Sequence, residues 1–258
     1  MKTVTIVTAA SGNKLIKRCI ESVRKQTYQN ITHLVVIDGV ENLTKIDFLL
    51  ADLQFSERYE NEYRIILPWS IGKDRWNGHR IYAASTYIIE SDYVMYLDED
   101  NYLDPDHVEE CIKTIERGND WCFSFRKIVN AESKFICNDD CESLGKWPSI
   151  LDENDYFVDV ACYFLPKSVA VKLTPFWYRK AREPGEMEVD RLLVAVLRQN
   201  LPKYDSTYKY SVNYNVGNNP LSVQGEFFLN GNKAMLQKHN GKLPWKHSID
   251  SRPEDFRS

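Results

Sequence analysis

The chain has 258 residues, of which 43% are hydrophobic and 27% are charged, and its formal net charge is −4. This length and composition support a full hydrophobic core, in one large domain or in two closely packed halves. The acidic balance excludes a general nucleic-acid binder, which would show a clustered basic excess. No stretch reaches the roughly 18–20 apolar residues that span a bilayer, and the N-terminus lacks a signal-peptide pattern, so we expect a cytoplasmic protein without a transmembrane segment.

The first half of the chain alternates predicted strands and helices. A strand at residues 3–8 is followed by a turn at 11–13 and by a helix whose apolar residues share one face: Leu15, Ile16, Cys19, Ile20 and Val23. Further strands are predicted at 33–37, 63–67 and 93–97, with a helix over 81–89 before the last of them. This alternation favours an α/β fold with a mainly parallel central sheet flanked by helices.

The second half has fewer periodic signals. Asp104 is a predicted N-cap with Pro105 in the first turn of a helix, and residues 121–129 and 159–165 are predicted strands around an irregular acidic stretch at 138–155. Four apolar residues predict the buried face of a later helix: Val189, Leu192, Leu193 and Val196. After residue 213 the chain is rich in Asn, Gly and Lys, which predicts a loop-rich C-terminal segment.

Two aspartates directly after the strand at 93–97 form the most informative motif. Side chains alternate along an extended chain, so Asp98 and Asp100 are expected to project to one side and Glu99 to the other. Two carboxylates can share Mn²⁺ or Mg²⁺, which prefers oxygen ligands and keeps open positions for water and a diphosphate. The carboxyl ends of strands in an open α/β sheet are also where ligands bind. The alternative interpretation is that the two aspartates only begin a polar turn.

Three segments, in this order and spacing, resemble the inverting family 2 glycosyltransferases of the GT-A fold. They are the helix with its Gln-Thr-Tyr ending at residues 15–30, the strand end Val35-Val36-Ile37-Asp38-Gly39, and Tyr96-Leu97-Asp98-Glu99-Asp100. The resemblance is clear over residues 3–110 and thins afterwards. It implies a single GT-A catalytic domain over 1–258, with a nucleotide-sugar-binding half at about 1–105, an acceptor half at about 106–212 and the loop-rich segment at about 213–258.

The resemblance also implies where a donor would bind. In such enzymes a nucleotide-diphosphate sugar, most often a UDP-sugar, lies across the first half. Thr8, Ala10 and Asp38 would then line the nucleoside pocket, while Asp98 and Asp100 would hold the ribose and the Mn²⁺ or Mg²⁺ ion. A carboxylate at position 38 can accept a hydrogen bond from a base N–H or a ribose hydroxyl. A polar strand terminus is the alternative role of Asp38.

Catalysis by inversion needs a base that takes the proton of the acceptor hydroxyl as it attacks the anomeric carbon. Family members carry an acidic residue at the start of a helix in the second half, and residues 186–191 resemble that segment. Asp190 is the first candidate because it lies off the apolar face of its helix, and Glu188 is the second. Alternatively, both acids only complement the dipole of the helix N-terminus.

Other candidates have equally plain alternatives. Arg80 can serve a phosphate or ribose, or it can lie on a solvated helix face. His239 is a candidate third metal ligand and His247 has a similar position, because some GT-A enzymes place a further metal or diphosphate ligand in this tail. Residues 176–182 mix aromatic rings with cations, and this loop can stack on an acceptor sugar or fold under itself.

The leading interpretation is a metal-dependent inverting glycosyltransferase of polysaccharide biosynthesis. It would move a sugar from a nucleotide-diphosphate sugar to a hydroxyl of a glycan or lipid-linked glycan, with no nucleic-acid partner and with peripheral membrane contact left open. A sugar nucleotidyltransferase is the second interpretation, although residues 9–14 only poorly approximate a phosphate-binding loop. A non-catalytic nucleotide- or sugar-binding module on the same fold is the third.

Overall fold

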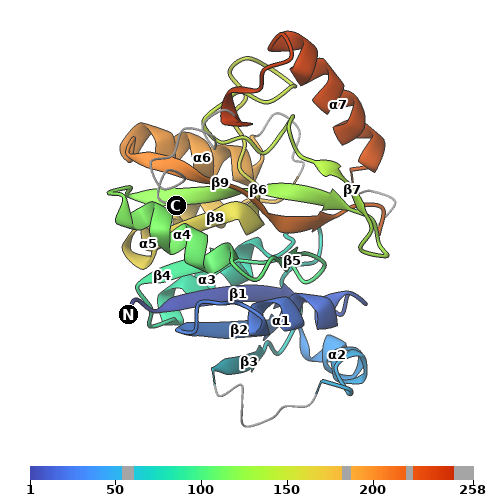
Figure 1. Cartoon of the computed structure of the whole chain (residues 1–258). Coiled ribbons are helices and arrows are strands. Elements are labelled where there is room, and N and C mark those ends of the chain that lie inside the picture. The colour runs from blue at the N-terminus through green and yellow to red at the C-terminus, as the bar shows by residue number, and fades with distance from the viewer. Residues whose placement is uncertain (54–60, 182–186, 219–222, 247–258) are drawn as a thin grey trace.

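The computed structural model describes residues 1–53, 61–181, 187–218 and 223–246. Within these residues one nine-stranded sheet has the order β3-β2-β1-β4-β8-β6-β9-β5, and β7 pairs with β6 (Figure 1). The strands are β1 Val4–Ala10, β2 Ile31–Ile37, β3 Glu62–Ile66, β4 Tyr93–Tyr96, β5 Tyr102–Leu103, β6 Trp121–Val129, β7 Phe135–Asn138, β8 Tyr163–Pro166 and β9 Tyr204–Asn215. The α-helices are α1 Ile16–Arg24, α2 Leu43–Leu49, α3 His79–Ile88, α4 His107–Glu116, α5 Lys167–Leu173, α6 Val189–Asn200 and α7 Gly225–Lys238, and short 3₁₀ turns lie at Val40–Asn42, Val160–Cys162 and Thr174–Trp177.

The first half of the sheet is parallel. β1 lies between β2 and β4, and Val4 pairs with Ile31 on one side and with Tyr93 on the other. Because β3 also runs parallel to β2, the carboxyl ends of all four strands meet at one edge. This edge is where an α/β sheet offers a ligand site, and the predicted fold class is confirmed.

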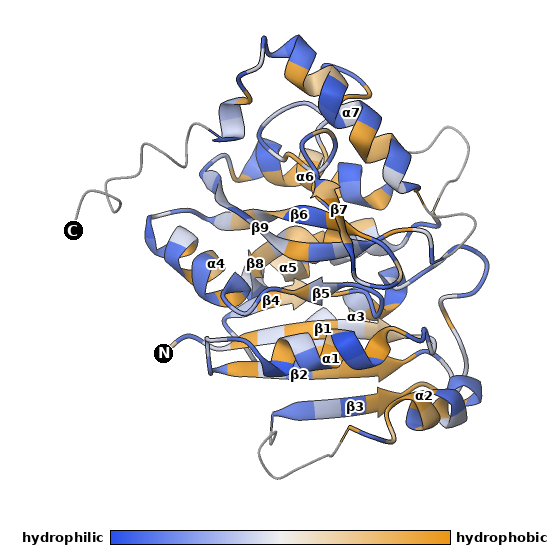
Figure 2. Ribbon diagram, turned by 45° about the vertical axis from the view of Figure 1, so that its right-hand side comes forward, coloured by the Kyte–Doolittle hydropathy of each residue, from blue (hydrophilic) through white to orange (hydrophobic). Residues whose placement is uncertain are grey.

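Helices cover both faces of the sheet. In Figure 1, α1 and α4 lie in front of it, whereas α3, α5 and α6 lie behind it, joined by contacts through the 3₁₀ turn at Thr174–Trp177. The strands of the first half are largely apolar, and α7 carries alternating apolar and polar stripes (Figure 2). None of the helices in the described part of the chain is long and apolar enough to cross a membrane.

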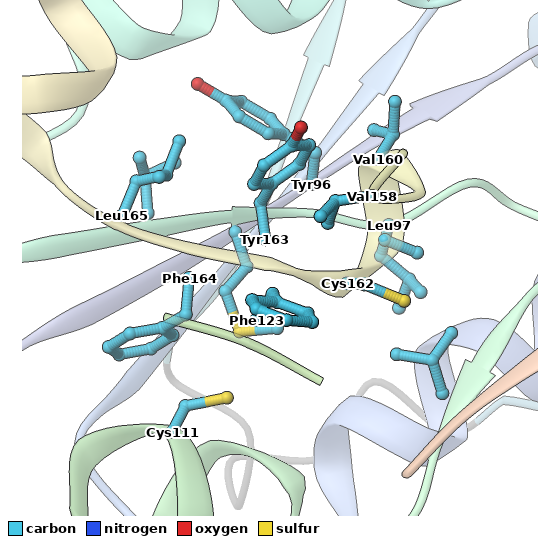
Figure 3. Packing of buried hydrophobic residues seen from close by; sticks show 14 of the residues in the cluster. Tyr96, Leu97, Cys111, Phe123, Val158, Val160, Cys162, Tyr163, Phe164 and Leu165 are labelled. Atoms are coloured by element: carbon cyan, nitrogen blue, oxygen red, sulfur yellow. The ribbon is translucent and has the colours of Figure 1, made fainter. Parts of the chain in front are cut away.

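The core is continuous where the two halves meet. β4 pairs with β8 in antiparallel register, and β8 in turn pairs with β6. Figure 3 shows side chains of this junction, among them Tyr96 near Tyr163, and Leu97 near Cys162. These residues, together with Phe123 and Phe164, have at most 1% of their surface exposed. Aromatic rings of this size bury enough area to fix the junction.

The predicted strands at 3–8, 33–37, 63–67, 93–97 and 121–129 are confirmed to within two residues at each end. The predicted N-cap at Asp104 is wrong: α4 begins at His107 after Asp106, and the Asp104 carboxylate instead accepts hydrogen bonds from Lys127 and Asn213. The predicted strand at 159–165 is shorter, because Val160–Cys162 forms a 3₁₀ turn in which the Asp159 carboxylate accepts the N–H of Ala161.

The expectation of a loop-rich segment after residue 213 is wrong, because β9 runs to Asn215 and α7 occupies Gly225–Lys238. Gly and Asn residues within α7 lower its intrinsic helix propensity, so the sequence pattern does not predict a helix there. Tertiary packing decides instead. Phe228, Gly231 and Met235 form its buried side, and a Cβ atom on Gly231 would lie 2.7 Å from the Cys141 sulfur, so glycine allows the helix to approach closely.

A buried arginine organises the acidic stretch of the second half. Arg126, on β6 and 2% exposed, donates hydrogen bonds to carboxylates from three places in the chain. Its Nε lies 2.8 Å from Asp139, and its two Nη atoms lie 2.5 Å from Asp159 and 2.6 Å from Glu142. The apparently irregular acids after β7 thus neutralise one buried charge.

The Arg126→Leu variant will therefore be less stable to unfolding than the unchanged protein. Removing one partner of a buried ion pair leaves uncompensated charge: Asp139 and Asp159 lose their cation, and Glu142 keeps only Arg191. We therefore expect the free energy of unfolding to fall by about 3–5 kcal/mol. Urea titration followed by circular dichroism measures this from the midpoint and slope. The exposed pair partner Lys113, changed to Met, should shift the midpoint far less. Equal shifts in the two variants would contradict the role given to Arg126.

Candidate active site

A cleft of about 580 Å³ opens at the carboxyl edge of the parallel strands. Its walls come from the end of β1 and the following turn, from Asp38 after β2, from the loop between β3 and α3, from residues 98–101 after β4, and from the end of β9. Both halves of the chain contribute, since Ala181 and Tyr214 also line it. The edge predicted to carry a ligand site is therefore hollowed.

Asp98 and Asp100 both line the cleft. The Tyr82 hydroxyl donates to Oδ1 of Asp98 at 2.5 Å, and the amide of Asn218 donates to Oδ2 of Asp100 at 2.6 Å. Burial, and next the charge of Asp100, raise the pKa of Asp98 to about 7. Burial also raises the pKa of Asp100 above its usual range. The two carboxylates thus repel each other in a partly dehydrated place.

Such a pair suits a divalent cation. Within the described residues neither Asp98 nor Asp100 forms a direct ion pair with a Lys or Arg side chain. Arg18 is the nearby cation: it donates to the backbone carbonyl oxygen of Asp100 at 2.9 Å, and its charge lowers the pKa of that carboxyl less than burial raises it. Each carboxylate accepts a hydrogen bond from a neighbouring side chain through only one of its oxygens. Two hard carboxylate donors with a single nearby arginine among the described residues fit Mn²⁺ or Mg²⁺, with water and phosphate oxygens completing the shell.

The chain turns at residues 98–101, where the N–H of Asn101 donates to the carbonyl oxygen of Asp98 at 3.0 Å, so the alternation predicted for an extended chain does not apply, and Glu99 lines the cleft together with its two neighbours. Its carboxylate accepts four hydrogen bonds from the turn after β1, from the N–H and hydroxyl of Ser11 and from the N–H groups of Gly12 and Asn13, at 2.7–3.1 Å. These N–H groups form the kind of cradle that binds phosphate in other proteins. Because Glu99 fills it, the turn after β1 cannot serve as the phosphate loop of a nucleotidyltransferase while Glu99 stays in place.

Asp38 lines the cleft but its carboxylate is already engaged. It accepts hydrogen bonds from the Ser70 hydroxyl at 2.8 Å and from the N–H groups of Ile71 and Gly72 at 2.6 and 3.0 Å. A Cβ atom on Gly72 would lie 2.6 Å from this carboxylate, so only glycine allows the contact. Asp38 therefore positions the loop between β3 and α3, which forms one wall of the cleft.

Two of the other predicted donor residues do not reach the cleft. Ala10 lines it, whereas Thr8 is fully buried and its hydroxyl is 2.9 Å from His33 Nε2, behind the cleft wall. Arg80 hydrogen-bonds the carbonyl oxygen of Ile71 and stacks on Trp76, with its guanidinium carbon 4.2 Å from the ring centroid. Arg80 thus supports the loop instead of lining the cleft.

His239 is not placed with the aspartates. It follows the last residue of α7, and its ring contacts Trp245 edge to face at 5.6 Å between centroids. Among the described residues no group of three or more His, Cys, Asp or Glu side chains is arranged to hold a metal ion. The expectation that His239 completes the metal site is therefore not met, and His247 lies outside the described residues.

Asp190 and Glu188 lie at the start of α6, on the acceptor side. Asp190 occupies the first turn, partly buried, and the hydroxyl of Tyr163 donates to its backbone carbonyl oxygen. Burial, followed by the negative charges of Asp159 and Asp98, raises the pKa of Asp190 well above its usual range. Its carboxylate is thus within electrostatic reach of Asp98, although it does not line the cleft. Glu188 precedes the helix and makes no capping hydrogen bond through its side chain.

Several residues of the site could not be named from the sequence. Tyr82 and Asn218 hydrogen-bond the paired aspartates from positions 16 and 118 residues away. Tyr82 lies on the apolar face of α3, where the sequence pattern predicts a core residue. Asn218 lies among other asparagines. Neither position carries a local signal. Only the fold brings them to the carboxylates.

The sequence model of the family described as Glycosyl transferase family 2 matches residues 3–141, which is more than half of the chain. EpsH of Bacillus subtilis (strain 168), which is named as a glycosyltransferase, is 25% identical over 112 residues. This match covers 42% of the chain but only 29% of the EpsH protein. The chain thus spans less than a third of the length of this relative.

Solved structures of S. aureus TarS have a similar fold. The structure of TarS 1-349 in complex with UDP-GlcNAc has a TM-score of 0.60 at 15% identity, covering 96% of this chain and 69% of that one. The complex of the same segment with UDP has a TM-score of 0.58 at 15% identity, covering 99% and 77%. At such low identity the likeness establishes the GT-A fold alone. Together with the family match, it confirms the resemblance read from the motifs: the chain belongs to glycosyl transferase family 2.

Proposed function

We propose that this protein is a metal-dependent inverting glycosyltransferase. It moves a sugar from a nucleotide-diphosphate sugar, of which a UDP-sugar is the first choice, to a hydroxyl of a glycan or lipid-linked glycan. The observation that carries the proposal is the pair Asp98 and Asp100 at the floor of the cleft, with Asp190 within electrostatic reach from the other half of the chain. Family membership supports the reaction class, and UDP-GlcNAc and UDP bound to TarS support the donor class.

In this proposal the donor lies along the carboxyl edge of β1, β2 and β4. The nucleoside sits between Ala10 and the loop that Asp38 holds, and the diphosphate lies towards Asp98 and Asp100. A bound Mn²⁺ or Mg²⁺ ion would be held by these two carboxylates and would offset the charge that develops on the leaving phosphate. Repulsion between Asp98 and Asp100 is relieved when their charge is matched, so donor and cation binding favour each other.

Asp190 supplies the base in this proposal. Its ionised carboxylate takes the proton of the acceptor hydroxyl, whose oxygen attacks the anomeric carbon from the face opposite the diphosphate, and the configuration therefore inverts. The raised pKa of Asp190 suits this role, because a base whose pKa lies closer to the working pH drives proton transfer better. Glu188, two residues before Asp190 at the N-cap of α6, is the second candidate for the base.

The experiment that tests the proposal is a calorimetric titration of nucleoside diphosphates and their sugar conjugates, first with Mn²⁺ and then with EDTA. We expect one nucleotide to bind in Mn²⁺ and to lose most of its affinity in EDTA. Incubation of that sugar conjugate with a saccharide panel should then give a product of inverted anomeric configuration by nuclear magnetic resonance. Absence of nucleotide binding by folded protein would reject the proposal.

A further inference from the structure

An aromatic pair, one ring exposed and one half-buried, lies next to residues that line the cleft and joins the two halves of the chain. Trp76 belongs to the loop between β3 and α3, and Tyr178 directly follows the 3₁₀ turn at Thr174–Trp177. Their ring centroids are 4.8 Å apart, at an interplanar angle of 48°. Trp76 is partly covered by the guanidinium of Arg80, whereas Tyr178 remains 70% exposed. One ring is thus supported, and the other faces solvent.

Backbone contacts hold the segment that carries Tyr178. On one side Trp177 is fully buried, and on the other side the N–H of Ala181 donates to the carbonyl oxygen of Arg75 at 2.7 Å. His79 Nδ1 donates to the carbonyl oxygen of Arg179 at 2.8 Å, and this histidine is only 7% exposed. An exposed ring fixed in this way contributes little to the core. It loses little conformational freedom when something binds to it.

The position of the ring favours an acceptor over a nucleoside. Arg75 and Ala181, which are hydrogen-bonded to each other, both line the cleft. The segment belongs to the acceptor half, which also supplies Asp190. The charge of Glu188 reaches His79, whose ring holds the segment at Arg179, so the start of α6 lies close by. Tyr178 therefore stands on the side of the cleft from which an acceptor hydroxyl would approach the base.

We propose that Tyr178 is a stacking platform for a sugar ring of the acceptor, with Trp76 bracing it from the donor half. This inference rests on the proposed glycosyl transfer and specifies its acceptor as a saccharide whose ring presents a face of C–H groups. Such a face packs on an aromatic ring while the hydroxyls at its edge remain solvated. Stacking fixes the plane of the acceptor sugar. The way that sugar is linked to the rest of the saccharide then determines which of its hydroxyls lies next to the base.

The test uses an immobilised saccharide array probed with the full chain in UDP and Mn²⁺. Tyr178→Ala should bind the recognised saccharides about tenfold more weakly than the unchanged protein, whereas Tyr178→Phe, which keeps the ring, should bind within about twofold. Tyr63→Ala is the matched control, because Tyr63 is a 54% exposed tyrosine on β3 and does not line the cleft. Circular dichroism confirms that each variant is folded, and calorimetry gives its UDP affinity.

The outcomes separate the inference from the proposed function. Loss of saccharide binding with unchanged UDP affinity supports the platform. Unchanged saccharide binding by Tyr178→Ala overturns it, and so does a parallel loss of UDP affinity, which would make Tyr178 part of the nucleoside site. Binding of UDP by the unchanged protein with no saccharide bound also overturns the platform but leaves the donor site standing. Failure to bind UDP at all rejects the proposed function and the inference with it.

Discussion

Asp190→Asn will lower the rate of sugar transfer by about 10²–10⁴-fold and leave nucleotide affinity unchanged, because a general base contributes about that factor and the amide keeps the shape of the side chain. Initial rates at saturating donor, with calorimetry of the nucleotide in Mn²⁺, measure the two effects separately. Glu188→Gln is the matched control at the start of the same helix, and we expect it to keep most of the activity. A larger loss in Glu188→Gln than in Asp190→Asn would move the base to Glu188.

The pH dependence of the transfer rate is a second test of Asp190 as the general base. A general base works in its ionised form, so the rate falls as pH decreases through its pKa. Burial and the charges of Asp159 and Asp98 raise that pKa, and the acidic limb of the profile is therefore expected above the usual aspartate value of 3.8. A cation at Asp98 removes one of these contributions and leaves the effect of burial. In the Asp190→Asn variant, the pH profile of the residual rate should no longer show this acidic limb.

Asp100→Asn will remove the affinity that Mn²⁺ adds to nucleotide binding. We expect a loss of at least about 10–100-fold, the range caused by removing even outer-shell partners of a metal. Titration of the nucleotide in Mn²⁺ and in EDTA measures the difference between the two conditions. Asp152→Asn, an exposed aspartate outside the cleft, is the control and should behave as the unchanged protein.

The same variant offers a check against misfolding. Burial, and next the charge of Asp100, raise the pKa of Asp98 to about 7, so removal of the Asp100 charge relieves the repulsion but not the cost of burial in the metal-free protein. Asp100→Asn should therefore melt at the same or a higher temperature than the unchanged protein in EDTA. Affinity that depends on Mn²⁺ to the same extent in the variant would contradict the metal site. If the variant melts at a lower temperature, any loss of nucleotide affinity would be due to impaired folding instead.

The parallel half of the fold could be predicted because its signals are local. Each strand is an apolar run with a turn after it, and Asp98 and Asp100 lie within three residues of the chain just after β4. The alternation argument fails for them, because residues 98–101 form a turn, although both side chains do line the cleft. Tertiary competition explains the errors. Asp104 has the residue type of an N-cap, yet its carboxylate is taken by Lys127 and Asn213 from β6 and β9, strands that are distant in sequence.

The site was less predictable than the fold for the same reason. Thr8 has the strand position expected of a cleft residue, but α1 covers it and His33 supplies its partner, so its side chain faces the interior. On α6 the predicted apolar face is buried at Val189 and Leu193, and Val196 packs against the core while partly exposed. Leu192 is only half-buried, and the other buried residues are Val194 and Leu197. A shift of one residue along a helix turns the face by about 100°. Which side of α6 the core covers depends on its packing against the 3₁₀ turn at Thr174–Trp177.

The antiparallel pairing of β4 with β8 constrains how this protein can work. The strand that ends in the paired aspartates shares a hydrogen-bonded ladder with a strand of the acceptor half, and Tyr93 and Val94 are paired there with Pro166 and Leu165. Rigid-body closure of one half on the other would have to break that ladder and open the aromatic packing beside it. Substrate entry and product release must therefore depend on loops at the rim, while the distance between donor and acceptor sites is built into the sheet.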